Sequence, residues 1–321
     1  MTASRMTLPG MRPLPIPAEL RNRPFTTAQA KAFGLTGDAL RGSRFVRLFR
    51  GVYACAQLPL TFVTRLNAAL LAVGGDARAT HVTGLRCYGV EIGPMLPLRL
   101  ASARTHRSRC DGIQLIRRMR VADADGPALR PEQCWVDACL DLDLVDAVIA
   151  ADWLIHNEAT TLATLTRFVE ATDNWEGIRN ARVALPYVRE KVRSPRETVT
   201  RLMLVLAGLP EPDECNLNIY DGDRFIGCGD LVWLAFSLVV EYDGRQHGED
   251  EQQWNHDIDR LDDFDDAHWR FVRVTNRRLR TPRQTVRRVY KKLVEGGYTG
   301  LEPVFDERWS RLFERRPAYT R

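Results

Sequence analysis

The chain has 321 residues, of which 45% are hydrophobic and 27% charged, and its formal net charge is +5. The length allows two or three domains with real cores, the composition is ordinary for a globular protein, and the charge is compatible with a polyanionic partner without identifying one. No apolar run approaches the roughly 20 residues of a membrane-spanning helix, and residues 1–17 lack the apolar core of a signal peptide, so we expect a cytoplasmic protein without a membrane partner.

Seven cysteines are scattered through the chain, and no two of them form a Cys-x-x-Cys pair. A zinc site usually contains such pairs, so we do not expect one. Thiols in the cytosol are kept reduced. We therefore expect reduced cysteines with a structural role.

The N-terminal stretch predicts a flexible arm at 1–20, because it is rich in proline, and then a small domain at 21–60. In that domain, Thr26 and Thr27 both offer N-caps to a short helix, and Thr36 opens a second helix. Two short strands follow. A helix, a short turn, a second helix and a basic hairpin are the order of a winged helix-turn-helix.

Arginines recur every three residues across the second helix and the hairpin: Arg41, Arg44, Arg47 and Arg50. Such cations could contact the phosphates of DNA. A small helical domain with a solvated basic edge is the alternative, and the residues alone leave the two balanced. The run from Phe25 to Ala54, which ends in Arg-Leu-Phe-Arg-Gly-Val-Tyr-Ala, resembles the winged-helix module of abortive-infection antitoxins of the AbiEi type. That resemblance implies DNA binding.

Residues 61–190 predict a connecting α/β domain in which we see no chemistry. Its expected elements are a helix at 61–73, strands at 98–101 and 113–116, and helices at 131–156 and 160–171. The segment from His81 to Gly89 resembles the short helix that follows the winged helix in the same antitoxins. A histidine there is more often a capping or core residue than a functional one.

Residues 191–296 predict a mixed sheet flanked by helices, and 297–321 a C-terminal tail. The expected elements are a helix from 194 to about 207, strands at 214–220, 224–233 and 238–243, an acidic helix within 248–266, a strand at 269–275 and a basic helix at 277–292. Ser194, Pro195 and Glu197 form a capping box, which by itself explains Glu197. The expected fold class is therefore α/β and multidomain.

Carboxylates gather near the end of the strand at 238–243. Since side chains alternate along a strand, Glu241 and Asp243 share one face, and Asp230 lies on the adjacent strand. Converging oxygen ligands suit Mg²⁺ or Mn²⁺, and such an ion can lower the pKa of a bound water and stabilise a phosphodiester under attack. An acid pair at a strand end is as often a structural salt-bridge site, for which Arg273 is available. Three arginines of the basic helix could hold a DNA backbone: Arg277, Arg278 and Arg280.

From about Ser194 to Leu293 the chain resembles the PD-(D/E)xK nuclease superfamily, and within it the Vsr-like (very-short-patch-repair endonuclease-like) branch. The motifs that carry the resemblance are Glu197, Asp230, Val240-Glu241-Tyr242-Asp243-Gly244-Arg245-Gln246-His247 and Trp269-Arg270-Phe271-Val272-Arg273-Val274-Thr275. It implies a restriction-endonuclease-like sheet at the C-terminus.

The same resemblance implies roles for individual residues. Asp230 and Glu241 would be the metal ligands, Glu197 an assisting acid, and Asp243 and His247 would lie at the catalytic edge. Asp243 stands where most of the superfamily has a lysine, which Vsr-like members also lack. The general base stays open between His247 and a metal-bound water.

Two functions stay open. The first is a metal-dependent DNA endonuclease that its N-terminal winged helix targets to DNA; a repair enzyme for a mismatch or a modified base would share this chemistry. The second is a non-catalytic, antitoxin-like DNA-binding transcriptional regulator that uses the nuclease fold as a scaffold. DNA is the expected partner in both, and homodimerisation stays open.

Overall fold

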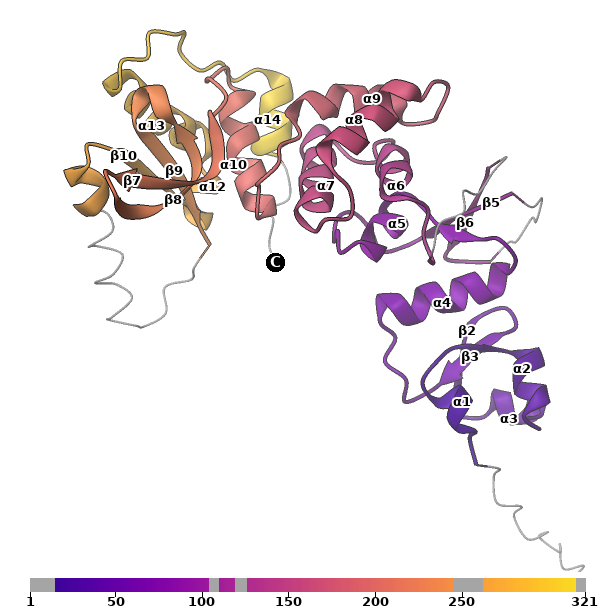
Figure 1. Cartoon of the computed structure of the whole chain (residues 1–321). Helices are drawn as coiled ribbons and strands as arrows, with labels where there is room; N and C mark the ends of the chain where they lie inside the picture. Colours follow the sequence, from indigo (N-terminus) through magenta and orange to yellow (C-terminus); the bar gives the residue numbers. More distant parts are fainter. Residues whose placement is uncertain (1–14, 104–109, 119–125, 245–261, 316–321) are drawn as a thin grey trace, which may run out of the picture. The chain divides into compact units, whose positions relative to one another are not determined.

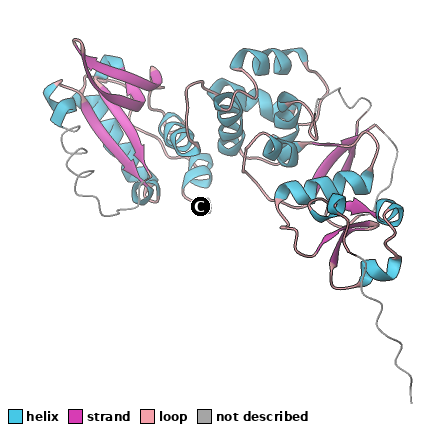
Figure 2. Cartoon of the chain, turned by 60° about the horizontal axis from the view of Figure 1, so that its bottom comes forward, coloured by secondary structure: helices cyan, strands magenta, loops and turns pink. Residues whose placement is uncertain are grey.

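The computed structural model describes residues 15–103, 110–118, 126–244 and 262–315. In these residues the protein is mixed α/β, with three small sheets (Figure 1; Figure 2). The chain folds into two compact units, Met1–Cys87 with Pro94–Arg130 and Tyr88–Gly93 with Pro131–Arg321. The stretch 61–190, expected as one connecting domain, is thus divided between the two units. Most of the expected arm and of the acidic helix lies outside the described residues.

The first unit contains short helices and two three-stranded sheets. Its elements are α1 (Ala18–Arg21), β1 (Phe25–Thr26), α2 (Thr27–Ala32), α3 (Gly37–Arg41), β2 (Phe45–Phe49), β3 (Val52–Cys55), α4 (Phe62–Val73), β4 (Arg78–Ala79), α5 (His81–Cys87), β5 (Leu98–Ser102) and β6 (Ile113–Arg117). One sheet has the order β1-β3-β2 and is antiparallel, and the other has the order β4-β5-β6, with β5 and β6 parallel. These elements confirm the helices and strands expected between residues 21 and 117.

The first helices begin where the sequence offers caps. Thr26 accepts a hydrogen bond from the Gln29 amide (3.2 Å), and the Gln29 side chain accepts one from the Thr26 amide (2.8 Å), which completes a capping box. Thr36 and Thr61 cap α3 and α4. Under these helices the rings of Phe25 and Phe45 meet edge to face, with centroids 5.8 Å apart.

His81 is a core residue, which is one of the two structural roles expected for it from the sequence. Its side chain is buried, with 3% of its surface exposed, and its backbone has a positive φ of 51°. Burial, with a smaller contribution from Arg99 and Arg118, lowers the pKa of His81 to about 3. The imidazole is therefore neutral at physiological pH.

The second unit contains a helical part and a four-stranded sheet. Its elements are α6 (Pro131–Ala138), α7 (Leu144–His156), α8 (Leu162–Ala171), α9 (Ile178–Ala184), η1 (Leu185–Tyr187), α10 (Pro195–Val205), β7 (Glu214–Asp221), β8 (Arg224–Trp233), η2 (Leu234–Phe236), β9 (Leu238–Asp243), β10 (Arg270–Thr275), α12 (Asn276–Leu279), α13 (Pro282–Glu295) and α14 (Glu307–Phe313). The sheet order is β10-β9-β8-β7; β7, β8 and β9 are antiparallel neighbours, and β10 runs parallel to β9. Residues 262–266 are also helical.

Two long helices expected from the sequence are each divided. The helix expected at 131–156 is α6 followed by α7, because the Asp143 carboxylate accepts from the Asp146 amide at 2.9 Å and caps a new helix. The helix expected at 277–292 is α12 followed by α13, because Pro282 lacks an amide proton and begins a helix rather than continuing one. Two further helices, α9 and α14, were not expected from the sequence.

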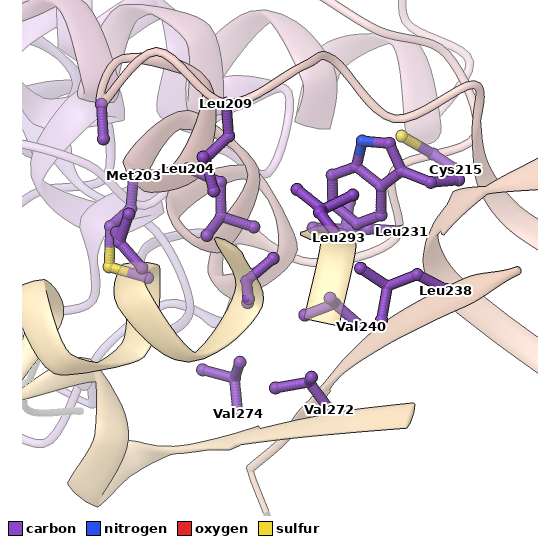
Figure 3. Packing of buried hydrophobic residues seen from close by; sticks show 14 of the residues in the cluster. Met203, Leu204, Leu209, Cys215, Leu231, Leu238, Val240, Val272, Val274 and Leu293 are labelled. Carbon is purple, nitrogen blue, oxygen red and sulfur yellow. The ribbon is translucent and has the colours of Figure 1, made fainter. Parts of the chain in front are cut away.

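The two faces of the four-stranded sheet pack into separate hydrophobic cores, as the alternation of side chains along β9 predicts. Leu238 and Val240 pack into the core beneath α10 and α13, where Figure 3 shows them gathered with Leu231 and Leu293. Val239 packs on the opposite face, in a smaller core that includes Phe264. The alternation places Glu241 and Asp243 on the face of Val239.

A buried ion-pair network fixes α10 against α7. The Arg201 guanidinium, fully buried, donates to the Asp152 carboxylate (3.1 Å), to Glu211 (2.9 Å) and to the Tyr187 carbonyl (2.7 Å). Burial raises the pKa of Asp152 to about 6, and three donors, Arg201 among them, hold its ionised form. The network therefore holds α10, the helix that carries Glu197, against α7.

Candidate active site

Asp230 lies where the ladder between β8 and β9 ends. Its Oδ2 accepts a hydrogen bond from the Tyr242 amide at 2.7 Å, so the carboxylate takes the place of a backbone acceptor. The preceding residue is Gly229, and a Cβ there would lie 2.8 Å from side-chain atoms of Val232 and Val239. Only glycine fits this close approach of β8 to β9.

Glu241 is the residue of β9 that follows the end of the same ladder. Leu231 and Val240 are the last antiparallel pair at this end, and Asp230 and Glu241 are the next residue on each strand. The Asp230 carboxylate binds the amide of Tyr242, the residue after Glu241. The half-buried Asp230 and Glu241 therefore lie on neighbouring strands where their pairing ends.

Asp243 forms an ion pair across β9 and β10. Its Oδ2 lies 3.6 Å from Nη1 of Arg273, and the two side chains are 19% and 30% exposed. The parallel register pairs Arg273 not with Asp243 but with Glu241. The predicted availability of Arg273 as a structural partner is confirmed, and its side chain lies beside both acids.

Glu197 is a buried hydrogen-bond acceptor at the start of α10, with 7% of its surface exposed. Ser194 Oγ accepts from the Glu197 amide (3.2 Å), as expected of an N-cap, while Glu197 Oε2 accepts from the Arg193 amide (2.9 Å) and from Asn216 Nδ2 (2.6 Å). The carboxylate therefore joins the helix start to β7. Ser194 therefore caps the helix as expected, but the Glu197 side chain accepts from the amide of Arg193, one residue before the N-cap, and not from that of Ser194 as a capping box requires.

Asn216 is a residue of this site that the sequence analysis omitted. Its Nδ2 also donates to the Lys191 carbonyl at 2.8 Å, and its φ is 50°. The residues on either side of Asn216 pair with the residues on either side of Asp230, so the two lie opposite each other. Asparagine is among the few residues that adopt a positive φ readily, which was the only signal in the sequence.

A series of polar residues thus follows the four strands from β7 to β10: Asn216, Asp230, Glu241 and Arg273. Glu241 and Arg273 pair in register, and Asn216 and Asp230 lie between paired residues of β7 and β8. Glu197 joins the series at Asn216, and Asp243 joins it at Arg273. Four of the five residues predicted for catalysis, Glu197, Asp230, Glu241 and Asp243, are therefore members of this series or contact one of its members. The fifth, His247, lies outside the described residues.

A divalent ion at this site would need oxygen ligands from nearby side chains. Among the residues described, no group of three or more His, Cys, Asp or Glu side chains is arranged as a metal site. Mg²⁺ takes oxygen ligands and usually keeps several waters beside one or two protein carboxylates. Asp230 and Glu241 match that smaller requirement.

Basic side chains predicted to contact DNA lie on both units. Arg41 pairs with Asp38, Arg44 lies 5.6 Å from the Phe45 ring centre, and Arg47 and Arg50 are exposed. In the second unit Arg277 and Arg280 are exposed.

Arg278 differs from these surface arginines. It is half-buried, and its Nη1 donates to the Arg273 carbonyl. Burial lowers the pKa of Arg278, and the neighbouring Arg288, Arg273 and Arg277 add to that shift. Positive charge is therefore concentrated beside β10.

Comparison with known proteins finds two relatives, whose names describe no activity. The chain is 24% identical over 207 residues to two proteins of Mycobacterium tuberculosis, "Uncharacterized protein MT2308" of strain CDC 1551 / Oshkosh and "Uncharacterized protein Rv2248" of strain ATCC 25618 / H37Rv. The match covers 64% of this chain and 75% of each relative. No family model matches, and no solved structure matches. In the part of the chain that the structure describes, no helix is both long and apolar enough to cross a membrane.

Proposed function

We propose that this protein is a metal-dependent DNA endonuclease that hydrolyses phosphodiester bonds. The observation that carries the proposal is the 2.7 Å hydrogen bond from the Tyr242 amide to Asp230 Oδ2, which holds Asp230 beside the part of β9 that contains Glu241. Two carboxylates on adjacent strands are a donor set for Mg²⁺ or Mn²⁺. A bound ion would act as a Lewis acid on the phosphodiester and lower the pKa of the attacking water.

The side chains around the two acids have separate roles in this proposal. Asp230 and Glu241 hold the ion. Arg273 supplies positive charge where the superfamily signature has a lysine, and Asp243 positions that guanidinium through their 3.6 Å ion pair. Glu197 acts as a positioning residue, because both of its hydrogen bonds go to the protein, at Arg193 and Asn216.

The proposed fold assignment follows the order of elements. We assign α10, β7 to β10 and α13 to the Vsr-like PD-(D/E)xK fold, supported by three antiparallel strands followed by a parallel fourth one. We assign β1, α2, α3, β2 and β3 to a winged helix that targets the enzyme to DNA. The exposed Arg47 and Arg50 on and after β2 support that assignment.

A second function is a non-catalytic, antitoxin-like DNA-binding regulator. Glu197 and Asp243 favour it, because both already serve as partners of protein groups. This alternative predicts duplex binding that survives loss of Asp230 and Glu241 but not loss of Arg47 and Arg50.

The proposed compartment is the cytoplasm. Burial raises the pKa of Cys87 and of Cys215 to about 11, so these thiols stay protonated and unreactive. Structural thiols of this kind are typical of a reducing compartment.

A plasmid assay separates the two functions. Purified protein is incubated with supercoiled plasmid and Mg²⁺ or Mn²⁺, beside Asp230→Ala and Glu241→Ala. Nicking by the wild type alone supports the endonuclease. Equal behaviour of the three proteins removes it and leaves the regulator.

A further inference from the structure

A cavity of about 310 Å³ lies beside β10. Its walls come from β10, α12 and α13, and they consist of Phe271, Val272, Arg273, Arg278, Arg288 and Lys292. No residue of β9 lines it, although β9 is the one described strand that pairs with β10. The cavity therefore lies along the edge of the sheet that faces away from β9; it is called the β10 pocket below.

The β10 pocket carries a surplus of positive charge. Four of its six lining residues are cations. Asp243 and Glu295 pair with two of them, at 3.6 Å from Arg273 and 2.7 Å from Lys292. Burial lowers the pKa of Arg278, and the nearby Arg288, Arg273 and Arg277 lower it further, because like charges repel one another. An anion in the pocket would relieve that repulsion.

Protection of an edge strand is the competing explanation, because natural proteins place cations on exposed edges to prevent pairing. Arg278 already serves that purpose, because its Nη1 donates to the Arg273 carbonyl of β10. Arg288 and Lys292 project from α13, one turn apart, and edge protection does not require them.

We propose that the β10 pocket binds a phosphate of a nucleic-acid backbone. Guanidinium groups present several N–H donors in a plane that matches phosphate oxygens, and the pocket brings three of them together with an ammonium. Arg273 lines the pocket and also lies opposite Glu241, so this one side chain connects the pocket with the acid of β9. The choice of nucleic acid rests on the proposed function; the phosphate chemistry does not.

Adjacent residues of α13 offer a matched control. Arg287 and Lys291 are one position before Arg288 and Lys292, carry the same charges and lie outside the pocket. Arg287 instead faces the Phe305 ring, 5.6 Å from its centre. The pocket variant is Arg288→Gln with Lys292→Gln, and the control variant is Arg287→Gln with Lys291→Gln.

The test is binding of the full-length protein to a fluorescent DNA duplex in EDTA, over a range of salt concentrations. The pocket variant is expected to bind at least about tenfold more weakly and to lower the slope of log K against log salt by about 2. The control variant should change affinity less than threefold. Circular dichroism melting must show both variants folded, and each retains one lysine partner for Glu295.

Three results overturn the proposal. Equal weakening in both variants would mean a diffuse charge effect. Unchanged duplex binding with aggregation of the pocket variant would mean edge protection. Unchanged duplex binding with loss of inorganic pyrophosphate binding, measured by calorimetry, would mean a small phosphorylated ligand. Duplex binding in EDTA does not depend on catalysis, so the two proposals can fail separately. If the wild type cleaves plasmid but the pocket variant binds duplex normally, the pocket proposal is rejected and the endonuclease proposal stands. If duplex binding depends on the pocket but no cleavage occurs, the endonuclease proposal is rejected and the pocket proposal stands.

Discussion

Arg273 pairs in register with Glu241 but forms its ion pair with Asp243, two residues further along β9. One guanidinium therefore lies beside both acids of the strand. In the proposed fold assignment Asp243 occupies the position at which most PD-(D/E)xK proteins have a lysine, and β10 brings the Arg273 cation beside it. This relationship makes Arg273 and Asp243 separable by mutation.

The first prediction concerns that pair. Asp243→Asn should cost no more than about 1 kcal/mol of stability, because the pair is partly exposed, and should change the nicking rate only a few-fold. Arg273→Gln should slow nicking more strongly, because it removes the cation beside Glu241. Nicking rates and urea denaturation of both variants check this. Complete loss of nicking in a fully folded Asp243→Asn variant would make Asp243 a metal ligand instead.

The second prediction concerns Glu197. Glu197→Ala leaves the Arg193 amide without its acceptor and the Asn216 amide group with only the Lys191 carbonyl, which should lower the free energy of unfolding by about 1–3 kcal/mol. Glu197→Gln keeps one acceptor oxygen and should lose less. Urea denaturation measures both. If Glu197→Gln kept full stability but abolished nicking, Glu197 would be an acid of the reaction and not a positioning residue.

The third prediction concerns His81 and acid stability. The pKa of His81 is lowered from 6.5 to about 3, so the unfolded chain binds a proton that the folded chain does not. Stability from this residue is present above pH 6.5 and is lost as the pH falls toward 3, at about 1.4 kcal/mol per pKa unit.

His81→Asn is the matching variant, since asparagine tolerates the positive φ and does not titrate. The difference in unfolding free energy between wild type and variant should change between pH 6.5 and the lowest pH at which the protein still folds reversibly. A constant difference over that range would show that His81 is not buried as described.

The fourth prediction concerns the first unit. Arg47→Gln with Arg50→Gln should weaken duplex binding and lower the salt slope by about 2. The control, Arg167→Gln with Arg179→Gln, removes the same charge from exposed helix positions of the second unit. Fluorescence anisotropy in EDTA gives both values. Similar losses in the two variants would mean that net charge alone drives the binding.

Much of this arrangement could be predicted from local patterns. The alternation of β9 determines which side chains enter the core, since Val239 and Val240 pack on opposite faces. The caps at Thr26 and Ser194 locate helix starts within one residue. The break at Asp143 has a local signal, but the apolar stripe runs across it from Trp135 to Ile149; the break at Pro282 is signalled by the proline itself.

Other parts depend on contacts that no single segment encodes. Asn216 matters only because β7 and β8 place it opposite Asp230 while α10 brings Glu197 to it. The β10 pocket likewise needs the parallel register of β10 and the packing of α13. Such features are decided by tertiary geometry, which residue patterns do not contain.

In the proposed function, Asp230 and Glu241 hold a catalytic divalent ion. The most direct measurement is the Mg²⁺-dependent nicking rate of Asp230→Asn and Glu241→Gln beside wild type, with Glu170→Gln on α8 as an exposed control. Asparagine at 230 still accepts from the Tyr242 amide, so the fold should persist. We expect the nicking rates of both site variants to be lower by about 100-fold or more. Their melting temperatures should be unchanged, and the Glu170→Gln control should nick at the wild-type rate. Site variants that fold and nick plasmid at the wild-type rate would contradict the proposed function.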